Sequence, residues 1–92
     1  MTDYVYELLD VTDDESYYPV GIWPTRGAAM MAIGDVMYWE SDGYHDKYAE
    51  FQLFRRAVGF SSIGVGKVIA KKEFYISDDP PGFTRTITRV FA

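Results

Sequence analysis

The sequence contains no cysteine and only one histidine. Without cysteine the chain has no disulfide, no thiolate metal site and no thiol nucleophile. The histidine is His45, and none of Ser41, Ser61 and Ser62 lies in a nucleophile-elbow pattern. Because catalysis needs several cooperating groups, and one histidine does not supply them, the sequence predicts a protein that is not an enzyme.

Long apolar runs are also missing. No stretch approaches the roughly 18 apolar residues that a membrane span needs. Residues 1–10 have neither the basic start nor the apolar segment of a signal peptide. Secreted domains of this size commonly depend on disulfides, which this chain lacks. We therefore expect a cytoplasmic protein that does not contact the membrane.

Motifs for metals and cofactors are absent as well. Asp42, His45, Asp46 and Glu50 match neither EF-hand nor zinc spacing. The Gly-Lys pair at 66–67 lacks both the upstream glycine and the following hydroxyl residue of a phosphate-binding loop. The acids gather in predicted turns, where we expect them to be solvated, and this argues against a buried acid–base pair. The sequence predicts no metal and no cofactor.

Large apolar side chains, by contrast, are abundant. The chain has 92 residues, of which 48% are hydrophobic and 17% aromatic. A chain of this length lies slightly below the common domain size of about 100–150 residues. We therefore expect one domain over residues 1–92, with a dense core that contains many aromatic rings.

Apolar periodicity and turn residues predict an α+β domain with the element order ββαβββ. The expected strands are 4–11, 17–23, 49–58, 66–76 and 83–91, and the expected helix runs from Pro24-Thr25 to Glu40. Ser41-Asp42-Gly43 is the expected helix stop. The simplest arrangement is a largely antiparallel sheet with one helix packed on one face.

Several residues indicate where these elements lie. The first strand has apolar residues on both faces, which is typical of a strand inside the sheet. Pro19 lacks a backbone N–H, so the second strand should lie at an edge. Thr25 is the expected helix N-cap. The helix residues expected to face the sheet are Ala29, Ala32, Ile33, Val36 and Met37. In the fourth strand, Val68, Ala70, Phe74 and Ile76 are expected inward, and Lys67, Lys71, Glu73 and Tyr75 outward.

The charges are divided unevenly along the chain. The net charge is −5, but residues 1–50 hold eleven acids and two bases, whereas residues 51–92 hold three acids and seven bases. Such asymmetry indicates either charged partners or pairing between the two halves within one fold.

The turn at 12–16 and the segment 40–50 are rich in acids, and aromatic rings lie within or beside them, at Tyr17, Tyr38, Trp39, Tyr44 and Tyr48. Such surfaces dock on basic proteins, with rings as anchors and charge as steering. We take as the predicted partner-binding residues Asp13, Asp14, Glu15, Trp39, Glu40, Asp42, Tyr44 and Asp46. The expected partner is a protein complex with a basic surface, such as one that binds nucleic acid. A sheet edge or exposed rings could also pair two copies of the chain.

A basic set offers an alternative, the binding of single-stranded nucleic acid. Cations on one sheet face with an interleaved Tyr75 would suit a nucleic-acid strand. The sequence pI of about 4.6 argues against it, because such proteins commonly have a pI above about 9. The residues of this set are Arg55, Arg56, Lys67, Lys71, Lys72, Arg85 and Arg89.

The segment Tyr18–Ala32, YPVGIWPTRGAAMMA, is similar to strand–turn–helix units of very small bacterial and phage proteins. As a short, acidic, cysteine-free and aromatic-rich chain, the whole sequence resembles phage-encoded accessory proteins, including anti-CRISPR proteins and other anti-defence inhibitors. This resemblance implies a stoichiometric binder that blocks a host complex in the host cell cytoplasm. It assigns no role to any single residue.

Overall fold

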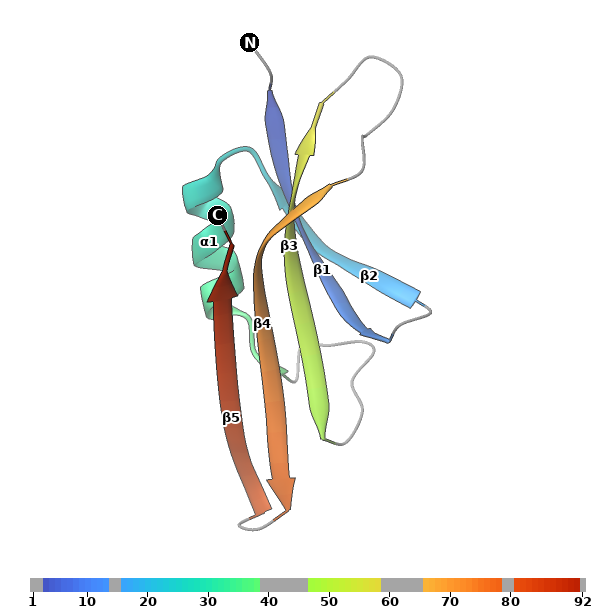
Figure 1. Cartoon of the computed structure of the whole chain (residues 1–92), viewed down its shortest axis with the longest axis vertical. Helices are drawn as coiled ribbons and strands as arrows, with labels where there is room; N and C mark the ends of the chain where they lie inside the picture. The colour runs from blue at the N-terminus through green and yellow to red at the C-terminus, as the bar shows by residue number, and fades with distance from the viewer. Residues whose placement is uncertain (1–2, 14–15, 39–46, 59–65, 79–80, 92) are drawn as a thin grey trace.

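The chain folds into a five-stranded antiparallel sheet with one helix on one face, as the computed structural model shows (Figure 1). The structure describes residues 3–13, 16–38, 47–58, 66–78 and 81–91. The elements are β1 (Tyr4–Asp13), β2 (Ser16–Trp23), α1 (Arg26–Asp35), β3 (Tyr48–Ala57), β4 (Lys67–Asp78) and β5 (Pro81–Val90). The strand order β2-β1-β3-β4-β5 confirms the predicted ββαβββ arrangement and the α+β class.

The first two strands lie where their residues predicted. β1 pairs with both β2 and β3, and its neighbours Leu8 and Leu9, which point to opposite faces, are both buried. β2 is an edge strand. Pro19 pairs with Leu9 of β1, and the register shifts between this pair and the next one, Leu8 with Gly21. An edge position tolerates a proline because one side of the strand makes no ladder hydrogen bonds.

The helix begins as predicted but ends earlier. The Ala28 N–H donates to the Thr25 hydroxyl, 3.3 Å away, which confirms the N-cap. The expectation that the helix continues to Glu40 is wrong, because α1 ends at Asp35 and Val36 is extended, with φ −66° and ψ 142°. The Met37 side chain is therefore exposed and not part of the core, whereas Val36 remains buried.

A buried lysine binds the carbonyl groups at the end of α1. The Lys72 ammonium, on β4, donates to the carbonyl oxygens of Gly34 at 2.6 Å and Val36 at 2.9 Å. The last carbonyls of a helix have no partner within the helix, and a cation there is favoured by the helix dipole. Lys72 thus binds the end of α1 to the sheet, and it lies on the face that carries α1 and not with Lys71 and Tyr75.

The core lies between α1 and the middle of the sheet. Its large members are Phe51 and Phe74, whose rings meet edge to face with centroids 6.1 Å apart. One alanine in each of α1, β3 and β4 has no exposed surface, so the helix approaches the sheet closely; these are Ala29, Ala49 and Ala70. The buried cluster consists of Leu8, Ala29, Ile33, Val36, Ala49, Phe51, Leu53, Ile69, Ala70 and Phe74.

Two expectations about which side chains are buried fail. The register between β3 and β4 shifts at Leu53 and Phe54 of β3, which face Ala70 and Val68 of β4. Ile69 is therefore an extra residue in β4, and it enters the core instead of Val68. The acids are not all solvated in turns either, since Asp10 is 1% exposed and Glu73 is 6% exposed. Asp10 accepts hydrogen bonds from the backbone N–H and the hydroxyl of Thr12, which compensates its burial.

Candidate interaction surfaces

The edge strand β2 carries no charged residue. Its sequence is SYYPVGIW, and Tyr17 and Ile22 are 55% and 60% exposed. One backbone edge of this strand pairs with β1 and the other faces away from the sheet. Charges, proline and bulges commonly protect edge strands. β2 has Pro19 beside a register shift but no charge, so its exposed residues on either side of Pro19 form a candidate docking surface.

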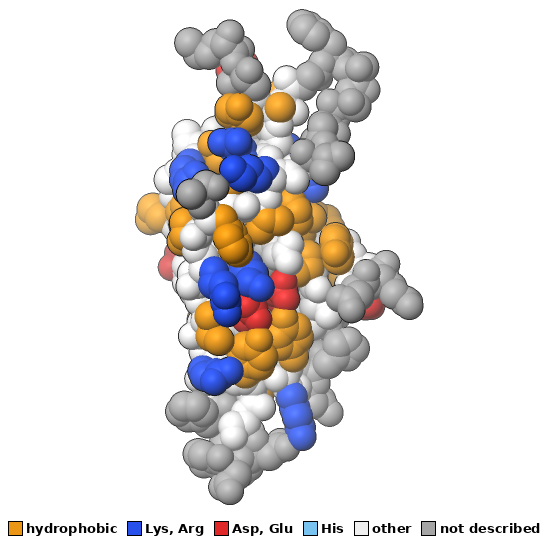
Figure 2. Space-filling model, in the orientation of Figure 1, with side chains coloured by type: hydrophobic (Ala, Val, Ile, Leu, Met, Phe, Trp, Pro, Cys, Tyr) orange, Lys and Arg blue, Asp and Glu red, His pale blue; other side chains and the backbone are white. Residues whose placement is uncertain are grey.

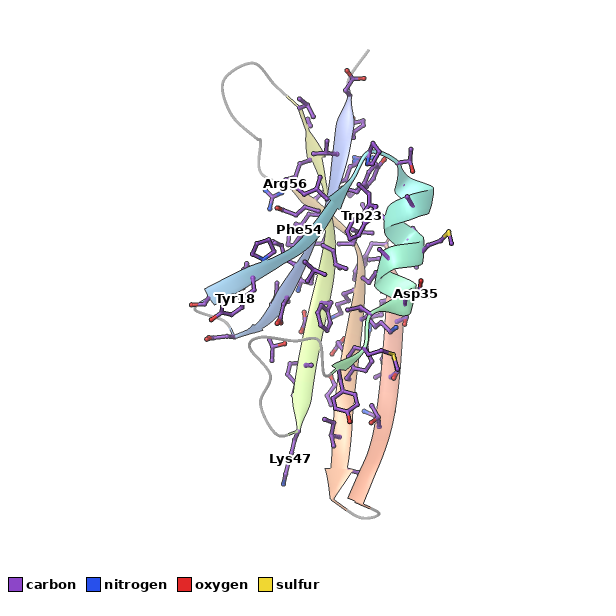
Figure 3. All side chains as sticks on the ribbon, turned by 180° about the vertical axis from the view of Figure 1, so that it is seen from behind. Tyr18, Trp23, Asp35, Lys47, Phe54 and Arg56 are labelled. Carbon is purple, nitrogen blue, oxygen red and sulfur yellow. The ribbon has the colours of Figure 1, made fainter. Side chains whose placement is uncertain are left out.

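Acidic residues adjoin this edge at the β1–β2 hairpin. Asp13 pairs with Ser16 at the end of the two strands, and Asp14 and Glu15 between them lie outside the described residues. Tyr17 and Tyr18 follow Ser16 at the start of β2, next to the hairpin; Tyr18 is labelled in Figure 3. We call Asp13, Asp14 and Glu15 the acidic turn. The other predicted partner-binding residues, Trp39, Glu40, Asp42, Tyr44 and Asp46, lie outside the described residues, as does His45.

A groove of about 150 Å³ opens between β2 and α1, on the helix side of the edge strand. Trp23 forms one wall, and Asp35, at the end of α1, contributes the carboxylate of the lining (Figure 3). Gly21 makes room for this indole, because a Cβ at Gly21 would lie 2.6 Å from Cη2 of Trp23. The remaining lining residues are Leu8, Val20, Ala32 and Val36.

The sheet divides the predicted basic set between its two faces. The register places Arg55, Lys67 and Lys72 on the face that carries α1, where Arg55 lies over the Tyr4 ring at 4.5 Å. The opposite face, which we call the open face, carries Arg56, Lys71, Arg85 and Arg89. Figure 2 shows this face, with basic side chains beside acidic ones near its middle.

Glu73 is the centre of a charged cluster on the open face. Its Oε2 accepts a hydrogen bond from the Tyr75 hydroxyl. The Lys71 ammonium lies 3.0 Å from Oε1, an ion contact without hydrogen-bond alignment, and the Arg89 guanidinium is 3.9 Å away. The hydrogen bond from Tyr75 lowers the pKa of Glu73, and the Lys71 charge adds to this effect. Glu73 therefore stays ionised and neutralises part of the basic set.

A second carboxylate lies directly across the strand pair. Glu50 on β3 is opposite Glu73, and it accepts hydrogen bonds from the Tyr48 hydroxyl and the Gln52 amide. Burial, followed by this hydrogen bond, raises the pKa of Tyr48, and the bond to Glu73 raises the pKa of Tyr75. Both tyrosines therefore remain protonated donors that stabilise two adjacent like charges.

Another pair of opposite charges lies on the open face, between β1 and β3. The Arg56 Nε is 2.9 Å from Oε1 of Glu7, and the Arg56 guanidinium lies 5.3 Å from the centre of the Phe54 ring. The open face is therefore mixed in charge, not uniformly basic. Only Arg85, which lies 5.0 Å from the Tyr75 ring centre, has a guanidinium without an acidic partner among the described cations of this face.

Sequence reasoning missed two of these features. The groove forms where α1 packs beside β2. The only feature of the local sequence that indicates it is Gly21, which lies two residues before Trp23 on the same face of the strand. The carboxylate pair has a clearer signal, because Tyr48 and Glu50 lie two residues apart, as do Glu73 and Tyr75. Residues at this spacing in a strand share a face.

The part of the chain that the structure describes has neither a metal-binding cluster nor a membrane-spanning helix. No three histidine, aspartate or glutamate side chains there lie close enough to hold a metal ion. None of the described helical residues forms a helix long and apolar enough to span a bilayer. Comparison with models of protein families, with curated proteins and with solved structures found no match.

Proposed function

We propose that this chain is a non-enzymatic protein-binding module that docks on a basic surface of a host complex and blocks it, as inhibitors encoded by phages and mobile elements do. The observation that carries the proposal is the uncharged, exposed strand β2 directly after the acidic turn. The resemblance of the whole chain to such inhibitors supports the biological setting.

The chemistry of β2 suits a protein partner. Tyrosines at the start of the strand supply large contact areas at low entropic cost, and they are common anchors in interfaces. The adjacent acids of the acidic turn attract a basic partner and orient it before contact. A free strand edge adds main-chain hydrogen bonds, which give affinity to an extended partner segment.

Glu73 on the open face is poorly suited to act as a general acid. A carboxylic acid that donates a proton near neutral pH needs a raised pKa, whereas the pKa of Glu73 is lowered. The Tyr75 hydroxyl and the Lys71 ammonium hold this carboxylate in its ionised form. We therefore assign the Glu50–Glu73 pair to the structure of the sheet.

The test is affinity capture from bacterial lysate after nuclease treatment, read by mass spectrometry. The bait is the tagged chain, and the matched bait carries lysine at Asp13, Asp14 and Glu15. We expect a protein complex that the parent chain retains and the reversed variant loses, while circular dichroism shows both folded. Equal capture by both baits, or recovery of the chain's own copies alone, would reject docking through the acidic turn.

A second candidate is binding of single-stranded nucleic acid on the open face. It is favoured by one observation, the position of Lys71, Arg85 and Arg89 with Tyr75 on that face. It predicts oligonucleotide binding that weakens steeply with salt and is lost when Arg85 and Arg89 are changed to glutamate. Absence of binding to single-stranded DNA and RNA at low salt would reject it.

A further inference from the structure

The groove between β2 and α1 has an apolar body and one charge at its rim. Five of its six lining residues are apolar, and the sixth, Asp35, is exposed. Neither a lysine nor an arginine among the described residues forms an ion pair with Asp35. The only charge of the lining is therefore negative and open to a ligand.

The groove has the size of one side chain. A dry cavity of about 150 Å³ can hold a benzene-sized group, and this groove has about that volume. An aliphatic stem would replace water against Leu8, Val20 and Val36, and a terminal cation would reach the rim. The indole of Trp23 provides a face over which a cation is attracted.

The neighbouring strand edge defines how such a side chain would arrive. A partner segment that pairs with the outer edge of β2 projects alternate side chains to the two faces of the sheet. Those on the helix face are directed toward the groove, because Val20 and Trp23 of β2 line it. Pro19 offers no backbone N–H, so an extended segment would pair with β2 after Pro19, along Val20–Trp23, and insert a side chain in the same pose.

From these observations we infer that the groove is a recognition pocket for a single arginine or lysine side chain, presented by an extended segment of the protein partner. The inference rests on the proposed function, since it names the partner chemistry that the same edge recognises. Charge complementarity selects this occupant: a long aliphatic stem matches the walls, and the guanidinium or ammonium pairs with Asp35.

The test uses the fluorescence of Trp23 as the reporter. The chain has two tryptophans, so Trp39→Phe leaves Trp23 alone. The probes are three eight-residue peptides, acetylated and amidated, of one extended sequence with arginine, norleucine or glutamate at the fourth position. We expect the arginine peptide to shift the emission and to bind at least about tenfold more tightly than the norleucine peptide, as a desolvated ion pair and a cation–π contact require.

Two variants locate the binding. Asp35→Asn should abolish the difference between the arginine and norleucine peptides, and Ala32→Met should weaken both by filling the groove. Asp3→Asn removes an exposed carboxylate elsewhere and is the matched control, expected to bind as the parent does. Equal affinities for the arginine and norleucine peptides, or an unchanged preference in Asp35→Asn, would overturn the inference.

The same variants separate this inference from the proposed function. If Asp35→Asn captures the partner as well as the parent does, while reversal of the acidic turn abolishes capture, docking stands and the pocket is wrong. If neither change affects capture, both are wrong. If both changes weaken capture and the arginine peptide competes with the partner, both are supported.

Discussion

Lys72 is a buried charged side chain that joins the end of α1 to the sheet. Its ammonium satisfies two carbonyls at the end of α1 and lies 5.3 Å from the centre of the Phe74 ring. Replacement by methionine keeps the aliphatic stem and removes the charge. The carbonyls of Gly34 and Val36 then lose a charged donor in a buried place, which carries a desolvation penalty.

We expect Lys72→Met to lower the free energy of unfolding by about 1–3 kcal/mol, measured by urea denaturation followed by circular dichroism. Lys67→Met, at an exposed position of the same strand, is the control and should change stability by less than about 0.5 kcal/mol. Equal effects of the two substitutions would contradict the role given to Lys72.

The Glu73 cluster makes stability depend on pH in the acid range. A carboxylate whose pKa is lowered by folding stabilises the fold above its unfolded pKa, and this contribution disappears as the pH falls through the folded pKa. The pKa of Glu73 lies below its usual 4.5, chiefly because of the hydrogen bond from Tyr75. The wild-type chain should therefore lose stability as the pH falls below about 4.5.

The substitution Glu73→Gln should flatten this acid dependence, although the variant is less stable at neutral pH. Urea midpoints measured from pH 7 to pH 2.5 give the comparison. Tyr75→Phe should also reduce the slope, since it removes the donor that lowers the pKa. A Glu73→Gln slope as steep as that of the wild type would show that other carboxylates account for the acid loss.

At the scale of elements, local features of the sequence predicted the order of the strands and helix and the start of α1. Pro19 and the two-sided apolar pattern of β1 predicted the edge and the inner strand, and Thr25 predicted the start of α1. Each of these is a property of the backbone or of one strand, so the sequence around it is sufficient. The confirmed ββαβββ order follows from such signals.

The features that the sequence did not reveal depend on contacts between distant elements. The carbonyls at the end of α1 are bound by Lys72, 37 residues after Asp35 in the chain, and Ile69 enters the core at a register shift between β3 and β4. The groove needs β2 and α1 together. Of the predicted partner-binding acids, Asp13 alone is described, and its place beside β2 fits the prediction without testing it.

The edge strand allows a direct test of docking. Ile22 is exposed, so Ile22→Lys should change the free energy of unfolding by less than about 0.5 kcal/mol. A lysine there adds a charge to the edge that a basic partner must cover, and we expect capture of the partner to fall at least about tenfold, as loss of a central contact does. Met31→Lys, at an even more exposed position on α1, is the matched control. Equal capture by both variants would place the interface away from β2.

Among the described strands, charge is distributed unevenly across the sheet. The order β2-β1-β3-β4-β5 places β1, whose charged residues are all acidic, on one side of β3, and β4 and β5, which hold five bases, on the other. The Glu7–Arg56 pair neutralises charge where β1 meets β3, whereas Asp13 and Arg85 lie on opposite sides of β3. The two candidate functions therefore use opposite sides of one molecule.

Association kinetics distinguish these two sides. Charge steering accelerates encounter and is screened by salt, so the association rate reports the side that approaches the partner. For the captured protein partner, we expect the rate constant in stopped-flow experiments to fall about tenfold between 50 and 300 mM salt.

Reversal of the acidic turn to lysine should remove this dependence. Reversal of Arg85 and Arg89 to glutamate should leave the rate unchanged or raise it, because it extends the negative field. A rate that falls only in the arginine variant would mean that the partner meets the basic side of the sheet.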